Sequence, residues 1–383
     1  MTRTTTILGV LVAALVVSTQ CSVARAESVT LYGIVDTGIE YINHANPAGS
    51  SLVRMPGTTG EMPSRWGLKG SESLGGGYTA VFTLESGFAT GTGSLNQGGR
   101  FFGRQTYAGI DGPLGALTFG RQYSMIFWSL QPADLIGTNI YGLASLDAWI
   151  ANPRSDNSVV YRKSFNGVTV GASYSFGRDA SPANGSNAPG DGSCAGGVAG
   201  NAEACREWSL MLKYDASNWG AAASYDRQNG GMGATANLFN GLTPLALTGS
   251  GNRDTHLVVD GYAKVGKFMF GAVWVNRRVN SAVASTPNVT SNQFALEAQY
   301  QMSPALFLEA LLQRVIDRQQ DTRATMEVAR ATYLLSVRTA VYAQVGFLQN
   351  SVHAAYSVSG GGASTPGKGM SQMGSMLGIR HAF

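Results

Sequence analysis

The sequence has few cysteines, few charged residues and no long apolar run after its first segment. Charged residues make up 13% of the 383 positions, and 27 basic residues nearly balance 23 acidic ones. A nucleic-acid-binding chain would concentrate positive charge instead, so that class is disfavoured. Beyond the first residues, no stretch approaches the roughly 20 apolar residues that a membrane-crossing helix needs. No helical membrane span is therefore predicted.

The start of the sequence has the pattern of an export signal. Arg3 supplies a basic start, residues 7–17 form a short apolar run, and residues 24–26 (Ala-Arg-Ala) match the small-residue cleavage pattern. We therefore expect residues 1–26 to be a signal peptide and residues 27–383 to form one mature domain. Cleavage would remove two arginines from the 27 basic residues and leave 25 against 23 acidic ones.

Only three cysteines are present. Cys21 lies in the expected signal, where the preceding Ser-Thr-Gln is a poor match to a lipoprotein cleavage site. Cys194 and Cys205 remain as an even pair in an exported chain, and we expect them to form a loop disulfide. The alternative, a zinc site, needs further ligands nearby, and the closest histidine, His256, is far away in the sequence. No metal or other cofactor is implied.

What dominates the remaining sequence is a period of two. Between Glu207 and Asp215, apolar side chains at every second position alternate with polar ones, and Met211 is the one exception. The same alternation recurs in residues 268–278 and 292–301. Such strands fit a soluble sandwich with an apolar inner face, or a transmembrane barrel with an apolar outer face and a polar lumen.

The connections between these strands favour the barrel, because every second one is short. The short turns are residues 74–77, 112–115, 166–167, 217–218, 266–267 and 335–336. This asymmetry is typical of a barrel with tight periplasmic turns on one rim and long extracellular loops on the other, and it disfavours a soluble all-β module. Counting on this basis gives sixteen strands, and a barrel of 16 to 18 strands encloses an aqueous channel. They lie near residues 29–43, 64–73, 78–88, 100–111, 116–123, 157–165, 168–177, 206–216, 219–228, 254–265, 268–278, 292–301, 305–315, 322–334, 337–350 and 372–383.

Several motifs along the chain carry a family likeness. They are SVTLYG at 28–33, RWGLKG at 65–70, FTLESGF at 82–88, GRQY at 120–123, the hairpin at 333–342 and GIRHAF at 378–383. The sequence resembles the trimeric porins of Neisseria and Burkholderia, and the likeness spans the whole mature chain. It implies an all-β fold, a 16-stranded antiparallel transmembrane β-barrel with short periplasmic turns, long extracellular loops and an inward-folded third loop.

The resemblance also implies a location and partners. It predicts a homotrimer in the cell outer membrane, surrounded by outer-membrane lipid and lipopolysaccharide. Leu377, Ile379 and His381 alternate up to the C-terminal Phe383, the pattern by which the barrel assembly machinery recognises such proteins. Phe383 is therefore expected to belong to the assembly signal.

Residues 124–154 form a long connection that resembles the constricting third loop of these porins. In the family, acidic residues of this loop face basic residues on the barrel wall, and the resulting field sorts solutes by charge. The resemblance gives Asp134 and Asp147 as the loop acids. Arginine suits the wall because its guanidinium stays charged at ordinary pH. The wall candidates are Arg65, Arg104, Arg121 and Arg154.

These observations predict a general-diffusion porin, through which small hydrophilic solutes and ions pass passively, with mild anion preference. A substrate-specific channel on the same barrel is the alternative, because aromatic residues of the third loop could line a solute track. An enzyme is disfavoured, since no Gly-x-Ser-x-Gly elbow accompanies the histidines and a nucleophile needs a nearby base. The four histidines lie at loop edges or in strands: His44, His256, His353 and His381.

Overall fold

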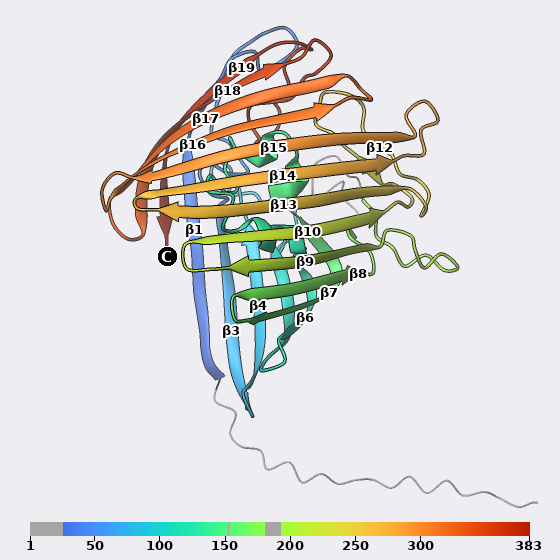
Figure 1. The fold of residues 1–383 in the computed structure, drawn as a ribbon, viewed down its shortest axis with the longest axis vertical. Helices are drawn as coiled ribbons and strands as arrows, with labels where there is room; N and C mark the ends of the chain where they lie inside the picture. Colours follow the sequence, from blue (N-terminus) through green and yellow to red (C-terminus); the bar gives the residue numbers. More distant parts are fainter. Residues whose placement is uncertain (1–25, 152, 181–192) are drawn as a thin grey trace, which may run out of the picture.

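The computed structural model describes residues 26–151, 153–180 and 193–383, so the expected signal peptide up to residue 25 lies outside the described residues. Long antiparallel strands wrap around a central space (Figure 1). The sheet closes because β1 (Ala26–Ile42) pairs with both β3 (Arg65–Gly75) and β19 (Gln372–Ala382). At the seam, Gly33 and Phe383 exchange two backbone hydrogen bonds of 3.1 Å.

The closed sheet confirms the predicted number of barrel strands. It has 17 members among the described residues, of which β2 (Leu52–Arg54) is a short addition beside β1, and the other sixteen form the barrel. Between β3 and β19 these are β4 (Tyr78–Gly87), β5 (Gln105–Asp111), β6 (Ala116–Tyr123), β7 (Arg154–Phe165), β8 (Val168–Ser175), β9 (Glu207–Asp215), β10 (Trp219–Asn229), β13 (Arg253–Val265), β14 (Phe268–Asn280), β15 (Asn288–Gln301), β16 (Leu306–Asp317), β17 (Thr322–Leu334) and β18 (Thr339–Asn350). β11 (Thr235–Ala236) and β12 (Leu245–Ala246) form a small separate hairpin in one long loop.

β5 starts at Gln105, five residues later than the sequence indicates. Residues 100–104 precede β5 in an irregular segment, because the chain turns at Phe101 and Phe102. Both rings pack edge-on against Trp66, at centroid distances of 6.1 and 6.3 Å. Arg100 forms ion pairs with aspartates elsewhere on the barrel and does not continue the strand ladder.

The period of two separates an apolar outside from a polar inside. In β9, Leu210, Leu212 and Tyr214 are exposed on the outer face, whereas Ser209 is buried on the inner face. Met211, the exception in the sequence pattern, also faces inward and packs with Met125. An apolar residue is stable on the polar face there because a helix inside the barrel covers it.

The short turns and the long loops occupy opposite rims, as predicted. Asn166 and Gly167, between β7 and β8, both have positive φ angles of 48° and 82°. Two successive positive φ angles define the type I′ turn that matches the twist of a tight hairpin, and Asn-Gly is the preferred sequence for it. None of the helices in the described part of the chain is long and apolar enough to cross a membrane.

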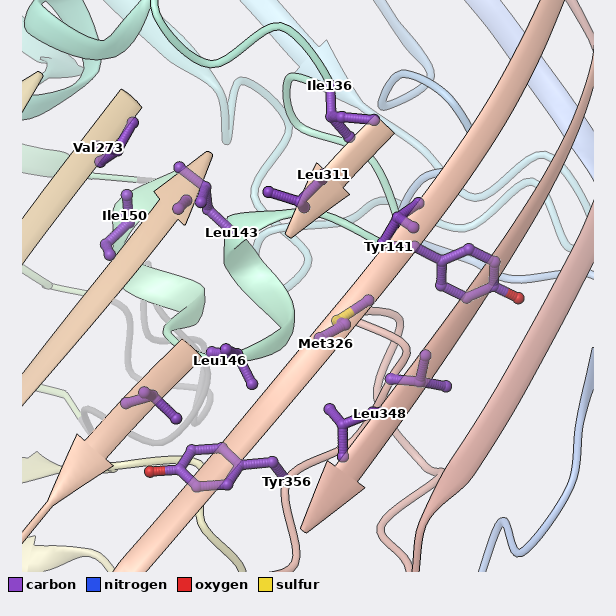
Figure 2. Close-up of a cluster of buried hydrophobic side chains, with 14 of the residues drawn as sticks. Ile136, Tyr141, Leu143, Leu146, Ile150, Val273, Leu311, Met326, Leu348 and Tyr356 are labelled. Carbon is purple, nitrogen blue, oxygen red and sulfur yellow. The ribbon is translucent and has the colours of Figure 1, made fainter. Parts of the chain in front are cut away.

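The third loop folds into the barrel, as the resemblance implied. Between β6 and β7 it forms α1 (Met125–Leu130), a 3₁₀ turn (Leu143–Ser145) and α2 (Ala148–Ala151). Figure 2 shows apolar side chains of this loop against residues of the barrel wall, and the main hydrophobic cluster of the protein lies at this contact. The loop side includes Ile136, Tyr141, Leu143, Leu146 and Ile150, and the wall side includes Val273, Leu311, Met326 and Leu348.

Candidate pore constriction

Polar side chains of the barrel wall hold the third loop across the lumen. Ser129 donates a hydrogen bond of 2.9 Å to Asp260 of β13, and the Ile136 amide donates one of 2.8 Å to Glu297 of β15. Asn139 donates one of 2.7 Å to Gln344 of β18. The loop is therefore attached to three separated strands, which fixes its position inside the barrel.

The irregular backbone of the loop is also satisfied by the wall. Gln293 and Gln313 donate side-chain hydrogen bonds to the carbonyls of Leu143 and Gly142, at 3.3 and 2.8 Å. Arg330 donates one of 3.0 Å to the Ile136 carbonyl. A buried carbonyl without a partner would cost free energy, so these inward-facing amides and the arginine stabilise a segment that has no ladder of its own.

A cavity of about 500 Å³ remains between one side of the loop and the wall. We call it the lumen cavity. Its charged lining includes four arginines, two glutamates and one aspartate: Arg65, Arg104, Arg330, Arg380, Glu61, Glu309 and Asp134. Opposite charges thus face the same cavity, which is the arrangement by which a pore sorts ions.

Three of the predicted constriction residues, Arg65, Arg104 and Asp134, line this cavity. Arg104 donates hydrogen bonds to Glu85 at 2.8 Å and to the Tyr123 hydroxyl at 2.9 Å. Arg65 lies 3.5 Å from the same Glu85. One glutamate therefore holds both guanidinium groups at the wall.

Two predicted residues, Arg154 and Arg121, do not line the lumen cavity. Arg154 stacks on the Tyr123 ring at 4.4 Å and donates a hydrogen bond of 2.6 Å to its hydroxyl. Arg121 pairs with Asp156 at 2.5 Å and donates to the Gly103 carbonyl at 2.7 Å. Arg154 adds positive charge next to the lumen cavity, whereas Arg121 ties β6 to its neighbours.

Asp147 lies against the wall and does not line the lumen cavity. Its carboxylate accepts hydrogen bonds of 3.1 Å from Arg277 and from His256, and a third of 3.0 Å from the Trp149 amide. Although burial favours the neutral acid, Arg277 and His256 hold the pKa of Asp147 below its usual range. The residue therefore anchors the end of the loop as a carboxylate.

Asp134 has a different environment. It accepts a hydrogen bond of 2.9 Å from the Gly137 amide. Burial raises the pKa of Asp134 to about 6. The carboxyl is therefore mostly ionised at neutral pH and becomes protonated in mildly acidic solution.

Part of the charged lining was not predicted from the sequence. Arg330 and Glu309 form an ion pair of 2.5 Å, and Arg380 and Glu61 form one of 3.2 Å. A signal was available for the first pair, since both residues lie on the polar face of their strands and are direct cross-strand partners. The second pair joins a strand to a distant loop and has no such signal.

The two cysteines form a disulfide within the long connection between β8 and β9, with Cα atoms 5.1 Å apart. Both are buried in a small apolar cluster with Leu245 and Leu247 near the β11–β12 hairpin. In the described parts of the chain, no group of three or more His, Cys, Asp or Glu side chains could hold a metal ion.

Comparisons with known proteins give this architecture a family. Residues 10–353 match the profile of Gram-negative porins. The chain is 39% identical over 183 residues to an outer membrane porin protein of Bordetella pertussis, a match that spans 43% of this chain and 47% of that protein. It is 29% identical over 385 residues to outer membrane porin protein 32 of Delftia acidovorans, covering 97% of this chain and 99% of that protein.

Solved structures share the fold. The anion-selective porin from Comamonas acidovorans superposes with a TM-score of 0.73 at 24% identity, over 93% of this chain and 99% of that one. The outer membrane protein OmpT of Vibrio cholerae superposes with a TM-score of 0.64 at 14% identity, over 93% and 97%. The relatives are outer membrane proteins and the barrel has the apolar outer face of a membrane-spanning one, so this is an outer-membrane protein. The relatives are porins, which points to a channel rather than an enzyme. By the profile match across most of its length, the chain belongs to the Gram-negative porin family.

Proposed function

We propose that this protein is a general-diffusion porin, through which small hydrophilic solutes and ions cross the outer membrane down their gradients, with mild anion preference. The observation that carries the proposal is the lumen cavity, lined by charged groups from both the third loop and the wall. Selection in such a pore comes from bore and charge, and no chemical step is required.

The charge balance around the lumen cavity supports the anion preference. Five arginines lie at or directly behind its surface: Arg65, Arg104, Arg154, Arg330 and Arg380. The acids beside them are Glu61, Glu85, Glu309 and Asp134. Positive charge exceeds negative charge by one, and the Comamonas structure with the same fold is that of an anion-selective porin.

We also propose a homotrimer assembled by the barrel assembly machinery and surrounded by outer-membrane lipid and lipopolysaccharide. A trimer form is known for Vibrio cholerae OmpT. The outer faces of β1 and β19 expose Leu31, Ile39, Leu377 and Ile379 beside the seam of the barrel, which gives an apolar surface for a neighbouring copy. Phe383 is 43% exposed at the end of that surface.

A substrate-specific channel is the second candidate, and one observation favours it. Tyr123 and Phe127 stack at 3.6 Å and line the lumen cavity beside Arg65 and Arg104. A solute with an anionic group and an apolar body could contact both the rings and the guanidinium groups.

Swelling of liposomes that contain the purified protein discriminates the two functions. General diffusion predicts that uptake of uncharged sugars falls smoothly with their size and is not blocked by any one of them. Uptake restricted to one solute class, or blocked by low concentrations of it, would contradict general diffusion and support the specific channel.

A further inference from the structure

Three arginines near the long-loop ends of neighbouring strands point away from the barrel. Arg227 lies on β10, Arg253 on β13 and Arg278 on β14, and their strands are adjacent (Figure 1). Thr255 is the cross-strand partner of both Arg227 and Arg278, and Arg253 lies two residues nearer the loops. Asp254, the residue between Arg253 and Thr255, is buried toward the lumen, so these arginines face outward.

The three side chains line a shallow outer pocket of about 250 Å³ that contains no acidic residue. Arg227 donates a hydrogen bond of 3.0 Å to Asn229, and Arg278 donates one of 2.8 Å to Asn276. Within the described ranges, no carboxylate lies within ion-pairing distance, 4.0 Å, of any of the three. By contrast, carboxylates neutralise the arginines that line the lumen cavity.

Aromatic residues show where this pocket lies relative to the membrane. Trp208 is the cross-strand partner of Arg227, and its ring lies 5.2 Å from that of Tyr225. Such rings form the girdle that marks a membrane interface. Phe268 lies in an aromatic group at the opposite end of β14, about ten residues from Arg278, which is the length a tilted strand needs to cross the apolar core.

We propose that Arg227, Arg253 and Arg278 form a site for the phosphate group of a phosphorylated glycolipid in the outer leaflet. The long loops face outside, so this end of the strands lies at the level of outer-leaflet headgroups. Guanidinium groups bind phosphate oxygens with paired hydrogen bonds, and the three positive charges exceed the two negative charges of a phosphate by one.

The surface below the arginines favours a lipid over free phosphate. Following the outer face of β13 and β15 toward the membrane centre, the exposed side chains are apolar, as at Val259 and Phe294. An acyl chain attached to the headgroup would lie along this strip. The site is also separate from the proposed trimer surface, which lies at β1 and β19.

The inference rests on the proposed membrane orientation and names the residues of the proposed lipopolysaccharide contact. The test measures, by native mass spectrometry, the binding of diphosphorylated lipid A to the protein in detergent micelles. We expect the triple variant R227Q/R253Q/R278Q to bind at least tenfold more weakly than the wild type. The matched control R318Q/R338Q/K368Q removes the same charge from exposed positions elsewhere and is expected to bind like the wild type.

A second comparison requires no variant. The wild type should bind lipid A from which both phosphates have been removed as weakly as the triple variant binds the intact lipid. Equal binding of the two lipids, or unchanged binding by the triple variant, would overturn the inference. Displacement of the lipid by millimolar inorganic phosphate would show that the arginines hold free phosphate, which also overturns it.

Single-channel conductance of the same samples separates this site from the proposed channel function. The triple variant is expected to conduct like the wild type, because its substituted side chains face away from the lumen. Normal conductance with unchanged lipid binding refutes the lipid site alone. Absence of conductance in the wild type refutes the channel and leaves the lipid measurement valid.

Discussion

Among single residues, one or two neighbouring side chains fix the position of each charged group in the lumen cavity. Glu85 illustrates this, because it holds both Arg65 and Arg104 and thereby limits how far either guanidinium can move. Arg65 is the more exposed of the two. It is therefore the residue whose charge can be removed with least disturbance of the wall.

We expect R65Q to reduce the anion preference. A unit charge about 8 Å from a passing ion contributes about 0.5 kcal/mol in water, so its loss changes the partitioning of each ion about twofold. The measurement is the reversal potential under a salt gradient. The matched control is R338Q, which removes a positive charge from the exposed short turn between β17 and β18. A reversal potential of R65Q equal to that of the wild type would refute the role of Arg65.

The anion preference should also depend on pH. The pKa of Asp134 is raised to about 6, so lowering the pH from 7 to 5 protonates this carboxyl and removes a negative charge from the cavity. Anion preference is expected to increase over that interval in the wild type. D134N should already have the higher preference at pH 7 and should show a smaller change, and an equal pH response in both proteins contradicts the assignment.

Among the structural elements, the third loop depends most on its surroundings, because contacts with the barrel wall hold it in place. Its apolar side chains pack on Val273, Leu311 and Met326, while amides of the wall satisfy its backbone (Figure 2). Asp147 joins the loop to β14 through Arg277. The stability of the constriction is therefore distributed over packing and a few charged anchors.

D147N is expected to loosen the constriction without unfolding the barrel. A hydrogen bond to a charged group contributes about 1.5–3 kcal/mol, and the substitution weakens the contact of the carboxylate with Arg277. Open-channel noise should rise and closure should occur at lower voltage. The control D321N alters an exposed loop acid, and identical closing voltages in D147N and the wild type would refute the anchoring role.

The disulfide is expected to act on the external loops alone. Replacing Cys194 and Cys205 by serine should leave conductance unchanged, because the bond joins loop segments and no barrel strand. Without the bond, the chain near the partly exposed Arg206 should unfold locally more often, so trypsin is expected to cleave there faster. Equal cleavage rates would show that packing alone holds these loops.

At the scale of the whole molecule, the strands were predictable because one physical constraint acts on each of them. Lipid on one side and water on the other impose a period of two, which Leu210 and Leu212 show in β9. The one departure within β9, Met211, depends on where the third loop packs. That contact joins segments far apart in the sequence, so no local pattern reports it.

The constriction was predictable only in part for the same reason. Arg65, Arg104 and Asp134 came from a resemblance of motifs and line the cavity. Asp147 shares the loop with Asp134, yet it pairs with Arg277, which is 130 residues away. Such a pair depends both on the register of the barrel strands and on the path of the loop. The alternation of polar and apolar residues within one strand gives no information on either.

We infer that excess positive charge at a constriction inside a water-filled barrel sets the ion preference of this protein. The reversal potential of the wild-type protein in planar bilayers, under a potassium chloride gradient at neutral pH, measures that preference. We expect stepwise conductance in groups of three and a potential with the sign of weak chloride preference. A potential that shows potassium preference, or a correctly folded barrel that does not conduct, would contradict it.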